Sequence, residues 1–204
     1  MREGMNVKGA LRTLLAAATL LAGLAGAARA QNPNEAQSGD AALTYHWVRS
    51  NAAPGQCGCF SLNGGGLSGS WNFRENWAIA AELSSETRGA SVSQGYGSLT
   101  LTSFVAGVRY RAPQNWTGKA PKLQPFGEAL IGSAHAGGSE AGVANGTNAF
   151  ALRLGGGVDV PLNAHFAVRA VQLDWFRTGF ANLQNDRQNN FLVATGLVFR
   201  WSSK

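Results

Sequence analysis

The chain has 204 residues, of which 45% are hydrophobic and 14% charged, and its formal net charge is +6. This length allows one domain after a leader is removed, and the singly scattered Lys and Arg residues argue against a nucleic-acid-binding protein. No run of about 18 or more apolar residues follows position 31, so no transmembrane helix is expected. With 27 glycines and almost no helical periodicity, the sequence favours an all-β chain.

Residues Met1–Ala30 have the three parts of a secretory signal peptide. A basic start precedes the apolar core Leu14–Leu24, and Ala28 and Ala30 form a small-x-small cleavage site. A membrane helix is the alternative, but this apolar run is shorter than the roughly 20 residues that span a bilayer. Removing the leader removes four cations and one anion, which lowers the formal charge from +6 to +3.

After the leader, the sequence predicts a flexible lead-in over residues 31–39, a barrel over residues 40–201 and a tail over residues 202–204. The barrel segment alternates apolar with small or charged residues at period two, which is the pattern of strands. These runs are mostly longer than the usual strand of about five or six residues, and they suit a bilayer crossing. In chain order, the predicted strands cover residues 41–49, 60–72, 77–86, 99–111, 122–133, 148–160, 165–176 and 190–201.

The second predicted strand is rich in glycine and has no clear face pattern, so a β-bulge is expected there. Long polar connections alternate with mostly shorter ones along the chain, as expected for surface loops opposite periplasmic turns. The connections expected outside are 50–59, 87–98, 134–147 and 177–189, and those expected inside are 73–76, 112–121 and 161–164.

The last predicted strand ends in the alternating residues Leu197, Phe199 and Trp201. Together with the leader and the eight alternating strands, it resembles the small eight-stranded outer-membrane barrels, the group that includes the OmpA transmembrane domain and OmpX-like proteins. The resemblance covers the whole mature chain. It implies that Phe199 and Trp201 form the C-terminal signal for the barrel-assembly machinery, although Ser202–Lys204 follow the final aromatic residue.

The expected fold is an all-β, eight-stranded antiparallel up-and-down transmembrane β-barrel in the cell outer membrane. Closure of such a barrel satisfies every backbone hydrogen bond in lipid. The resemblance implies a monomer whose partners are outer-membrane lipids and lipopolysaccharide, the barrel-assembly machinery and periplasmic chaperones. No nucleic acid, cofactor or metal is expected.

The strand faces opposite the apolar ones carry charges whose sign alternates from strand to strand, as in a narrow polar lumen. An eight-stranded barrel is only wide enough for side chains to fill it, and unpaired buried charges are very costly. We therefore expect a salt-bridge network in the lumen; a gated ion path and a carboxylate pair for hydrolysis are the functional alternatives. The predicted network comprises Glu82, Arg109, Glu128, Arg153, Asp159, Asp174 and Arg200.

Cys57 and Cys59 are separated by one glycine in the first outer connection. In an exported protein two cysteines suggest a disulfide, although a bridge across one residue closes a small, strained ring that is easily reduced. Metal binding would need more ligands than Gln56 and His46 provide. The prediction is a local disulfide at the barrel mouth.

His135 begins a predicted outer connection near Ser133, Ser139 and Glu140, whereas His165 follows a turn and is expected at the membrane interface. A Ser/His/acid trio in a barrel loop resembles the outer-membrane lipid A deacylases, which are also eight-stranded. The spacing matches no catalytic motif, and small-residue loops commonly contain Ser. No catalytic residue is therefore predicted.

Arg169 shares the parity of Val171, Leu173 and Trp175, which predicts that it faces outward near the periplasmic end and snorkels to headgroups. Aromatic residues near the strand ends predict two interfacial girdles rather than a carbohydrate-stacking surface. The girdle residues are Trp47, Trp71, Trp77, Tyr110, Trp175, Phe199 and Trp201.

The sequence favours a non-catalytic protein with a structural or surface-interaction role. A narrow pore for small solutes is one rival, and a lipid-modifying barrel that uses His135 or Glu128 is another. A soluble, ligand-carrying barrel of the lipocalin type would place its apolar faces inside. Its exterior would then be charged, whereas the faces opposite the apolar ones carry mostly Gly, Ala and Ser.

Overall fold

The computed structural model describes residues 38–50, 60–88, 98–112, 123–138, 146–180 and 187–202. The predicted leader, most of the lead-in, and Cys57 and Cys59 lie outside these residues. The described part contains eight strands: β1 (Gly39–Ser50), β2 (Phe60–Arg74), β3 (Trp77–Arg88), β4 (Leu99–Arg111), β5 (Gln124–Gly138), β6 (Thr147–Pro161), β7 (Phe166–Thr178) and β8 (Gln188–Trp201).

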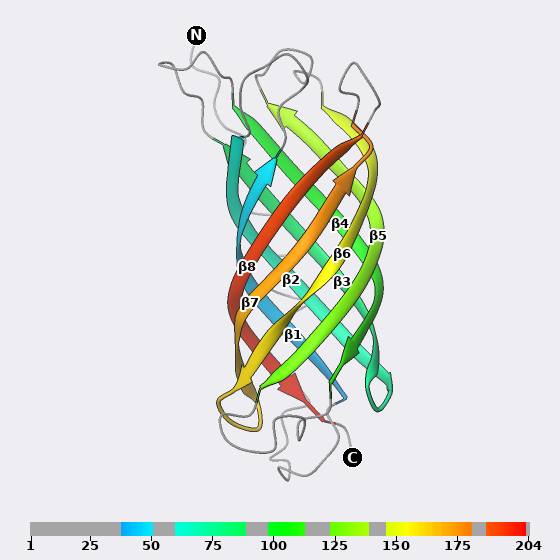
Figure 1. Cartoon of the computed structure of the whole chain (residues 1–204), viewed down its shortest axis with the longest axis vertical. Coiled ribbons are helices and arrows are strands. Elements are labelled where there is room, and N and C mark those ends of the chain that lie inside the picture. Colours follow the sequence, from blue (N-terminus) through cyan, green and yellow to red (C-terminus); the bar gives the residue numbers. More distant parts are fainter. Residues whose placement is uncertain are drawn as a thin grey trace, which may run out of the picture.

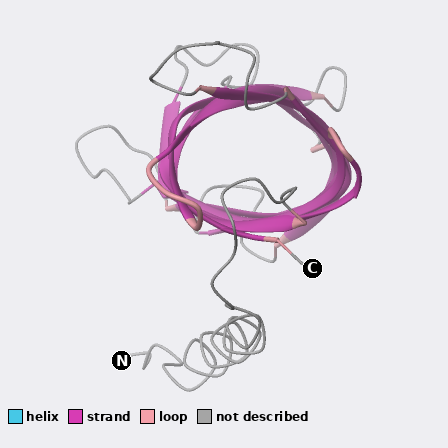
Figure 2. Cartoon of the chain, turned by 90° about the horizontal axis from the view of Figure 1, so that it is seen from below, coloured by secondary structure: helices cyan, strands magenta, loops and turns pink. Residues whose placement is uncertain are grey.

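The strands form one closed barrel in which each strand pairs antiparallel with its neighbours in sequence and β1 pairs with β8 (Figures 1 and 2). Following the paired residues once around the barrel measures the stagger of its strands. The path starts at Phe199 of β8, passes to its partner Ala41 of β1 and then through β2–β7, and it returns to β8 at Asn189, ten residues away. This stagger accompanies the oblique strands in Figure 1. The predicted eight-stranded antiparallel up-and-down barrel is confirmed.

Side-chain alternation gives the barrel an apolar outer wall and a charged interior. On β3, Ile79 and Leu83 are exposed on the outside, whereas Ala80 and Glu82 are buried inside. The same division on the other strands leaves large apolar residues such as Leu43 and Phe104 exposed on the wall. A ligand-carrying soluble barrel requires the opposite arrangement, so that alternative is wrong.

The two ends of the barrel are distinguished by their connections. The turn end carries the short connections at residues 75–76 and 162–165, and the loop end is the opposite one. Figure 1 shows the turn end at the bottom. In the sequence prediction the turn end faces the periplasm.

The fifth strand extends further toward the loop end than the sequence predicted. Residues 134–138 belong to β5, so the predicted connection at 134–147 is wrong in its first five residues. Their ladder partners on β4 run from Ser103 to Leu99, which keeps the sheet paired. The small residues Ala134 and Ala136 alternate with His135, but this segment contains too few large apolar residues for the alternation to be visible in the sequence.

β-Bulges interrupt the register in two strands. One lies in β2 between Asn72 and Arg74, and it fits the irregular second strand of the prediction. The other lies in β7 between Arg169 and Gln172, and it shifts the register against both β6 and β8. A bulge inserts an extra residue into one strand, so side-chain parity changes beyond it.

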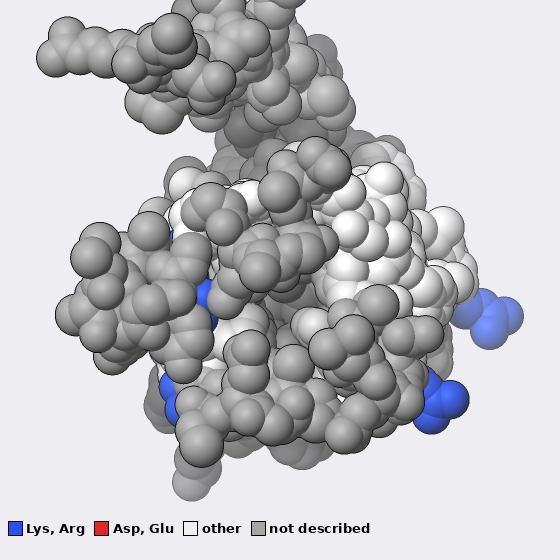
Figure 3. Space-filling view, turned by 90° about the horizontal axis from the view of Figure 1, so that it is seen from above, with Lys and Arg blue, Asp and Glu red and all other residues white. Residues whose placement is uncertain are grey.

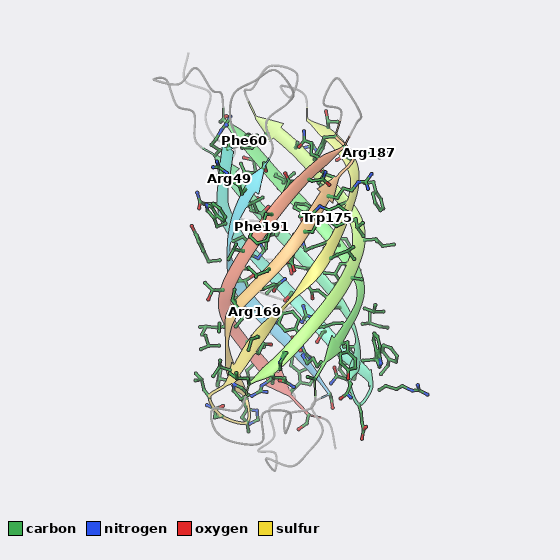
Figure 4. All side chains as sticks on the ribbon, viewed as in Figure 1. Arg49, Phe60, Arg169, Trp175, Arg187 and Phe191 are labelled. Atoms are coloured by element: carbon green, nitrogen blue, oxygen red, sulfur yellow. The ribbon has the colours of Figure 1, made fainter. Side chains whose placement is uncertain are left out.

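Arg169 therefore does not snorkel outward, and that prediction is wrong. The bulge in β7 separates its parity from that of Leu173 and Trp175, and Arg169 is fully buried inside the barrel. Figure 4 labels Arg169 in the turn-end half of the structure. Among the described residues, no helix is long and apolar enough to cross a membrane.

Candidate functional site: the barrel interior

The turn-end half of the interior contains a network of carboxylates and guanidinium groups. Asp40 forms an ion pair with Arg111 and lies 3.4 Å from Nη1 of Arg109, while Ser70 Oγ donates to its Oδ2 at 2.6 Å. Arg109 in turn contacts Glu128 Oε2 at 2.7 Å through both Nε and Nη2. All of these charged groups are buried, so each depends on its partners rather than on water.

Gln172 joins this network to the charges on β6 and β7. Its Nε2 donates to Glu128 Oε1 at 2.9 Å and to Asp174 Oδ2 at 2.7 Å, and its Oε1 accepts from Arg169 Nη1 at 2.8 Å. Arg169 also forms an ion pair with Asp159 at 2.9 Å. The sequence prediction missed Gln172 because its inward orientation depends on the β7 bulge.

A second network lies nearer the middle of the barrel. Arg153 on β6 forms an ion pair with Glu82 on β3, and its Nη2 donates to Ser84 Oγ at 3.4 Å. His46 on β1 is completely buried beside this pair, with Nδ1 2.8 Å from Glu86 Oε1 and Nε2 3.6 Å from Glu82 Oε1. The network thus connects β1, β3 and β6 across the interior.

Both ring nitrogens of His46 have hydrogen-bond partners inside the barrel. Nδ1 donates to Glu86 Oε1, because a carboxylate can only accept. Nε2 lies 2.8 Å from Thr44 Oγ1, and this hydroxyl is also 3.2 Å from the Gly66 carbonyl oxygen. The ring is therefore held between groups on β1 and β3.

Buried carboxylates and guanidinium groups are present in similar numbers in the described interior. The buried acids are six: Asp40, Glu82, Glu86, Glu128, Asp159 and Asp174. The buried arginines are five, and His46 is buried among them: Arg109, Arg111, Arg153, Arg169 and Arg200. Pairing between the two signs explains how so many charges are kept away from water in one barrel.

Gly66 and Gly155 make room for these side chains. A Cβ at Gly66 would lie 2.5 Å from His46 Cε1, and one at Gly155 would overlap Asp174 Oδ1. Both glycines face the lumen opposite a charged residue of the network. Their role here is small size rather than backbone freedom.

The loop-end half of the interior is filled largely by apolar side chains. Val48 pairs with Leu62 on one side and with Leu192 on the other, and all three are buried in one cluster with Phe176. Arg153 lies over the Phe176 ring at 5.0 Å, where the two layers meet. The lumen is therefore only half polar, in contrast to the polar lumen expected from the sequence.

Several of the network residues named from the sequence meet in the structure. Arg109 contacts Glu128 and Arg153 contacts Glu82, whereas Asp174 is held by Gln172. Arg200 donates to neutral acceptors, which are Gln124 Oε1 at 3.2 Å and the Asn163 carbonyl at 3.1 Å. Sequence reasoning placed Arg169 outside and left four further residues out of this network, which are Asp40, His46, Glu86 and Arg111.

His135 lies on the outer wall of β5 and not in a connection. Its Nδ1 is 2.8 Å from Asn148 Oδ1 on the neighbouring strand, and the two residues are ladder partners. Ser139 and Glu140, the remaining members of the suggested trio, lie outside the described residues. Among the part of the chain that is described, no group of three or more His, Cys, Asp or Glu residues could hold a metal ion.

Aromatic residues pack against one another on the wall at the turn end. Trp77 and Tyr110 have ring centroids 5.1 Å apart, and Trp201 packs against Phe199 at 6.2 Å and Trp71 at 6.5 Å. Toward the loop end, Trp175 and Phe191 are exposed on neighbouring strands (Figure 4). Two aromatic levels separated by apolar wall are the pattern of a barrel in a bilayer.

Comparison with known proteins gives the same architecture. Residues 15–199 match a family model for the outer membrane protein beta-barrel domain. The solved structure of Ail, the attachment invasion locus protein of Yersinia pestis, is 16% identical with a TM-score of 0.53, over 80% of this chain and 99% of that one. Neisserial surface protein A is 10% identical with a TM-score of 0.60, over 80% and 97%. No curated protein sequence matches. At these identities the structural likeness shows the fold alone.

Proposed function

This chain belongs to the family of outer membrane protein β-barrel domains, and we propose that it serves as a non-conducting, non-catalytic barrel with a structural or surface-interaction role. Its place in the cell is the outer membrane. The barrel forms a membrane anchor, and the loop end is the side that meets partners outside the cell. The sequence-derived partners, which are lipopolysaccharide, the assembly machinery and periplasmic chaperones, belong to this proposal.

The observation that carries the proposal is the filled interior. Ion pairs such as Arg153–Glu82 and Arg109–Glu128 cross the middle and the turn end. Toward the loop end, Val48, Leu62 and Leu192 pack in one apolar cluster. An ion would have to separate buried ion pairs and then cross an apolar constriction, and such constrictions exclude water. This arrangement favours an anchor over a pore.

A lipid-modifying enzyme receives less support. Thr44, His46 and Glu86 are linked in the order hydroxyl, imidazole, carboxylate, which is the connectivity of a catalytic triad. All three residues, however, are buried in the interior. A general base needs access to substrate. The burial of this trio therefore favours a packing role.

Ail, named for attachment and invasion, illustrates what a barrel of this architecture can carry. Its structure is also solved in complex with the heparin analogue sucrose octasulfate, with a TM-score of 0.52 to this chain. At 16% identity this likeness transfers no ligand. It supports surface interaction as a class of role for the proposed anchor.

Planar-bilayer conductance tests the non-conducting part. The refolded full chain should give no steady openings in a bilayer where an unrelated porin conducts. Large, steady openings that vanish on Arg153→Ala would show that the interior conducts and would overturn the proposal. The apolar variant Leu192→Ala in the loop-end cluster provides a control for general loosening of the barrel.

Mass spectrometry of lipid A tests the non-catalytic part. Cells that produce the wild-type chain and cells that produce His135→Ala should have the same lipid A acyl pattern as cells without the gene. An acyl pattern that changes with the wild type and reverts with His135→Ala would make the protein a lipid-modifying enzyme. Glu128→Gln, run in parallel, covers the second residue of that alternative.

A further inference from the structure

Three arginines lie near the loop end on adjacent strands of the outer wall. Arg49 is on β1, Arg177 is on β7, and Arg187 directly precedes β8. Because β8 pairs with both β7 and β1, the three residues occupy one sector of the barrel. Figure 4 labels Arg49 and Arg187 near the loop end.

The strand register sets the spacing of these arginines. Arg177 is opposite Asn189 and Arg49 is opposite Phe191, two positions further along the same face of β8. Neighbouring strands are about 4.8 Å apart and two residues along a strand span about 7 Å, so Arg49 and Arg177 flank β8 at roughly 12 Å. Arg187 lies two residues, or about 7 Å, beyond Asn189 on that face. One multiply charged headgroup can reach all three.

The aromatic residues below them place the arginines at the membrane surface. Trp47, Trp175 and Phe191 are 36%, 41% and 47% exposed on the wall of the same three strands. Each lies on the turn-end side of an arginine, as an interfacial aromatic belt does. The guanidinium groups therefore lie at headgroup level, while the rings lie against the acyl region.

The outer wall of β3 and β4 differs from this sector near the loop end. At a comparable position on β3 and β4, hydroxyls face outward instead: Ser85 pairs with Thr102 at 3.2 Å and Thr87 with Thr100 at 3.3 Å. Every described carboxylate is buried in the lumen except Glu75, which lies at the turn end. Figure 3, seen from the loop end, shows blue atoms at the rim and no red ones in view.

The contact of Arg49 does not neutralise its charge. Its Nη1 donates to Ser61 Oγ at 3.1 Å, and a hydroxyl is a neutral partner. Guanidinium groups bind phosphate bidentately and hold it more strongly than neutral donors do. A phosphorylated lipid in the same leaflet supplies the matching charge and sets its acyl chains against the aromatic residues.

We propose that Arg49, Arg177 and Arg187 form a binding site on the outer wall for the phosphorylated headgroup of an outer-leaflet glycolipid, with Trp47, Trp175 and Phe191 against its acyl chains. The site lies on β7, β8 and β1 and is separate from the filled lumen. It rests on the part of the proposed function that makes lipopolysaccharide a partner, and it does not depend on whether the lumen conducts or catalyses.

The test uses the refolded full chain in bilayer nanodiscs that contain phospholipid and a small fraction of lipopolysaccharide. Bound lipopolysaccharide is counted by native mass spectrometry after the nanodisc is removed. The variant Arg49→Gln/Arg177→Gln/Arg187→Gln should retain about tenfold less lipopolysaccharide than the wild type, because it loses the charge-assisted hydrogen bonds to phosphate. The wild type should likewise retain about tenfold less dephosphorylated than phosphorylated lipopolysaccharide.

Arg74→Gln is the matched control, because Arg74 is an exposed arginine at the turn end of β2. It should retain lipopolysaccharide as the wild type does. Equal retention by the triple variant and Arg74→Gln would overturn the site, and so would equal retention of phosphorylated and dephosphorylated lipid. The three substitutions are on the outer wall, so the faster gel mobility of the unboiled barrel should be unchanged and confirms that each variant is folded.

Discussion

Glu128 Oε2 lies 2.7 Å from Arg109 Nη2, and the same two residues are direct partners in the ladder between β4 and β5. The ion pair therefore needs no long reach, and it links adjacent strands inside the barrel. The Arg153–Glu82 pair is different, because it spans from β6 to β3. Ion pairs between adjacent strands reinforce the ladder, and ion pairs across the lumen hold in position strands that share no backbone hydrogen bonds.

Glu128→Gln should lower the free energy of unfolding by about 3 kcal/mol, because it leaves Arg109 buried with only the 3.4 Å contact to Asp40. Urea unfolding of the barrel in detergent or lipid measures this change. Glu75→Gln, at the exposed β2–β3 turn, should have almost no effect. Equal stability of Glu128→Gln and the wild type would show that this ion pair does not stabilise the lumen.

Gly66→Ala should destabilise the barrel by about 1–3 kcal/mol, since its Cβ would overlap the His46 ring and force that ring out of its hydrogen bonds. Gly69→Ala in the same strand is the control, because the nearest atom to its Cβ is 3.9 Å away. Unfolding midpoints of the two variants should therefore differ. Similar midpoints would mean that the space beside Gly66 is not needed by His46.

Nitrogen-15 NMR of the labelled barrel in detergent should show a proton on Nδ1 of His46, because this nitrogen donates to the Glu86 carboxylate. The variant His46→Gln identifies the signal by its disappearance. Chemical shifts of a ring without a proton on Nδ1 would contradict this hydrogen bond. His135 and His165, which are outside the lumen, provide reference signals from less buried rings.

Trp201→Ala should reduce the amount of barrel recovered from outer membranes several-fold, since it removes the aromatic residue that ends β8 and packs on Phe199 and Trp71. Trp175→Ala removes an exposed aromatic residue from the same wall and is the control for lost lipid contact. Gel mobility without boiling measures the folded fraction. Equal yields of the two variants would argue against a terminal assembly signal.

The sequence predicted the strands and most side-chain faces because alternation at period two is a local property. Glu82 and Arg153 could be assigned to the lumen in this way, since their strands continue without a break around them. Arg169 could not, because the bulge that turns it inward results from pairing with β6 and β8. The alternation of residues along one strand does not show where pairing with the neighbouring strands leaves an extra residue.

The candidate site was harder to predict than the fold. Gln172 is an uncharged residue whose importance arises from three simultaneous contacts with charged groups on β5 and β7. His46 was noted in the sequence only as a weak metal ligand, because its partner Glu86 is forty residues away. Such partners become neighbours only when the barrel closes, so spacing along the chain does not reveal them.

The seam between β1 and β8 has a consequence for the order of events in biogenesis. It pairs Gly39 with Trp201, so its two edges come from opposite ends of the described chain. Closing so long a loop carries a large entropic cost before any contact compensates for it. Until β1 and β8 pair, each exposes a row of unpaired amides and carbonyls, which is an open template for aggregation. Closure of this seam is therefore the strand pairing with the largest entropic cost in this barrel.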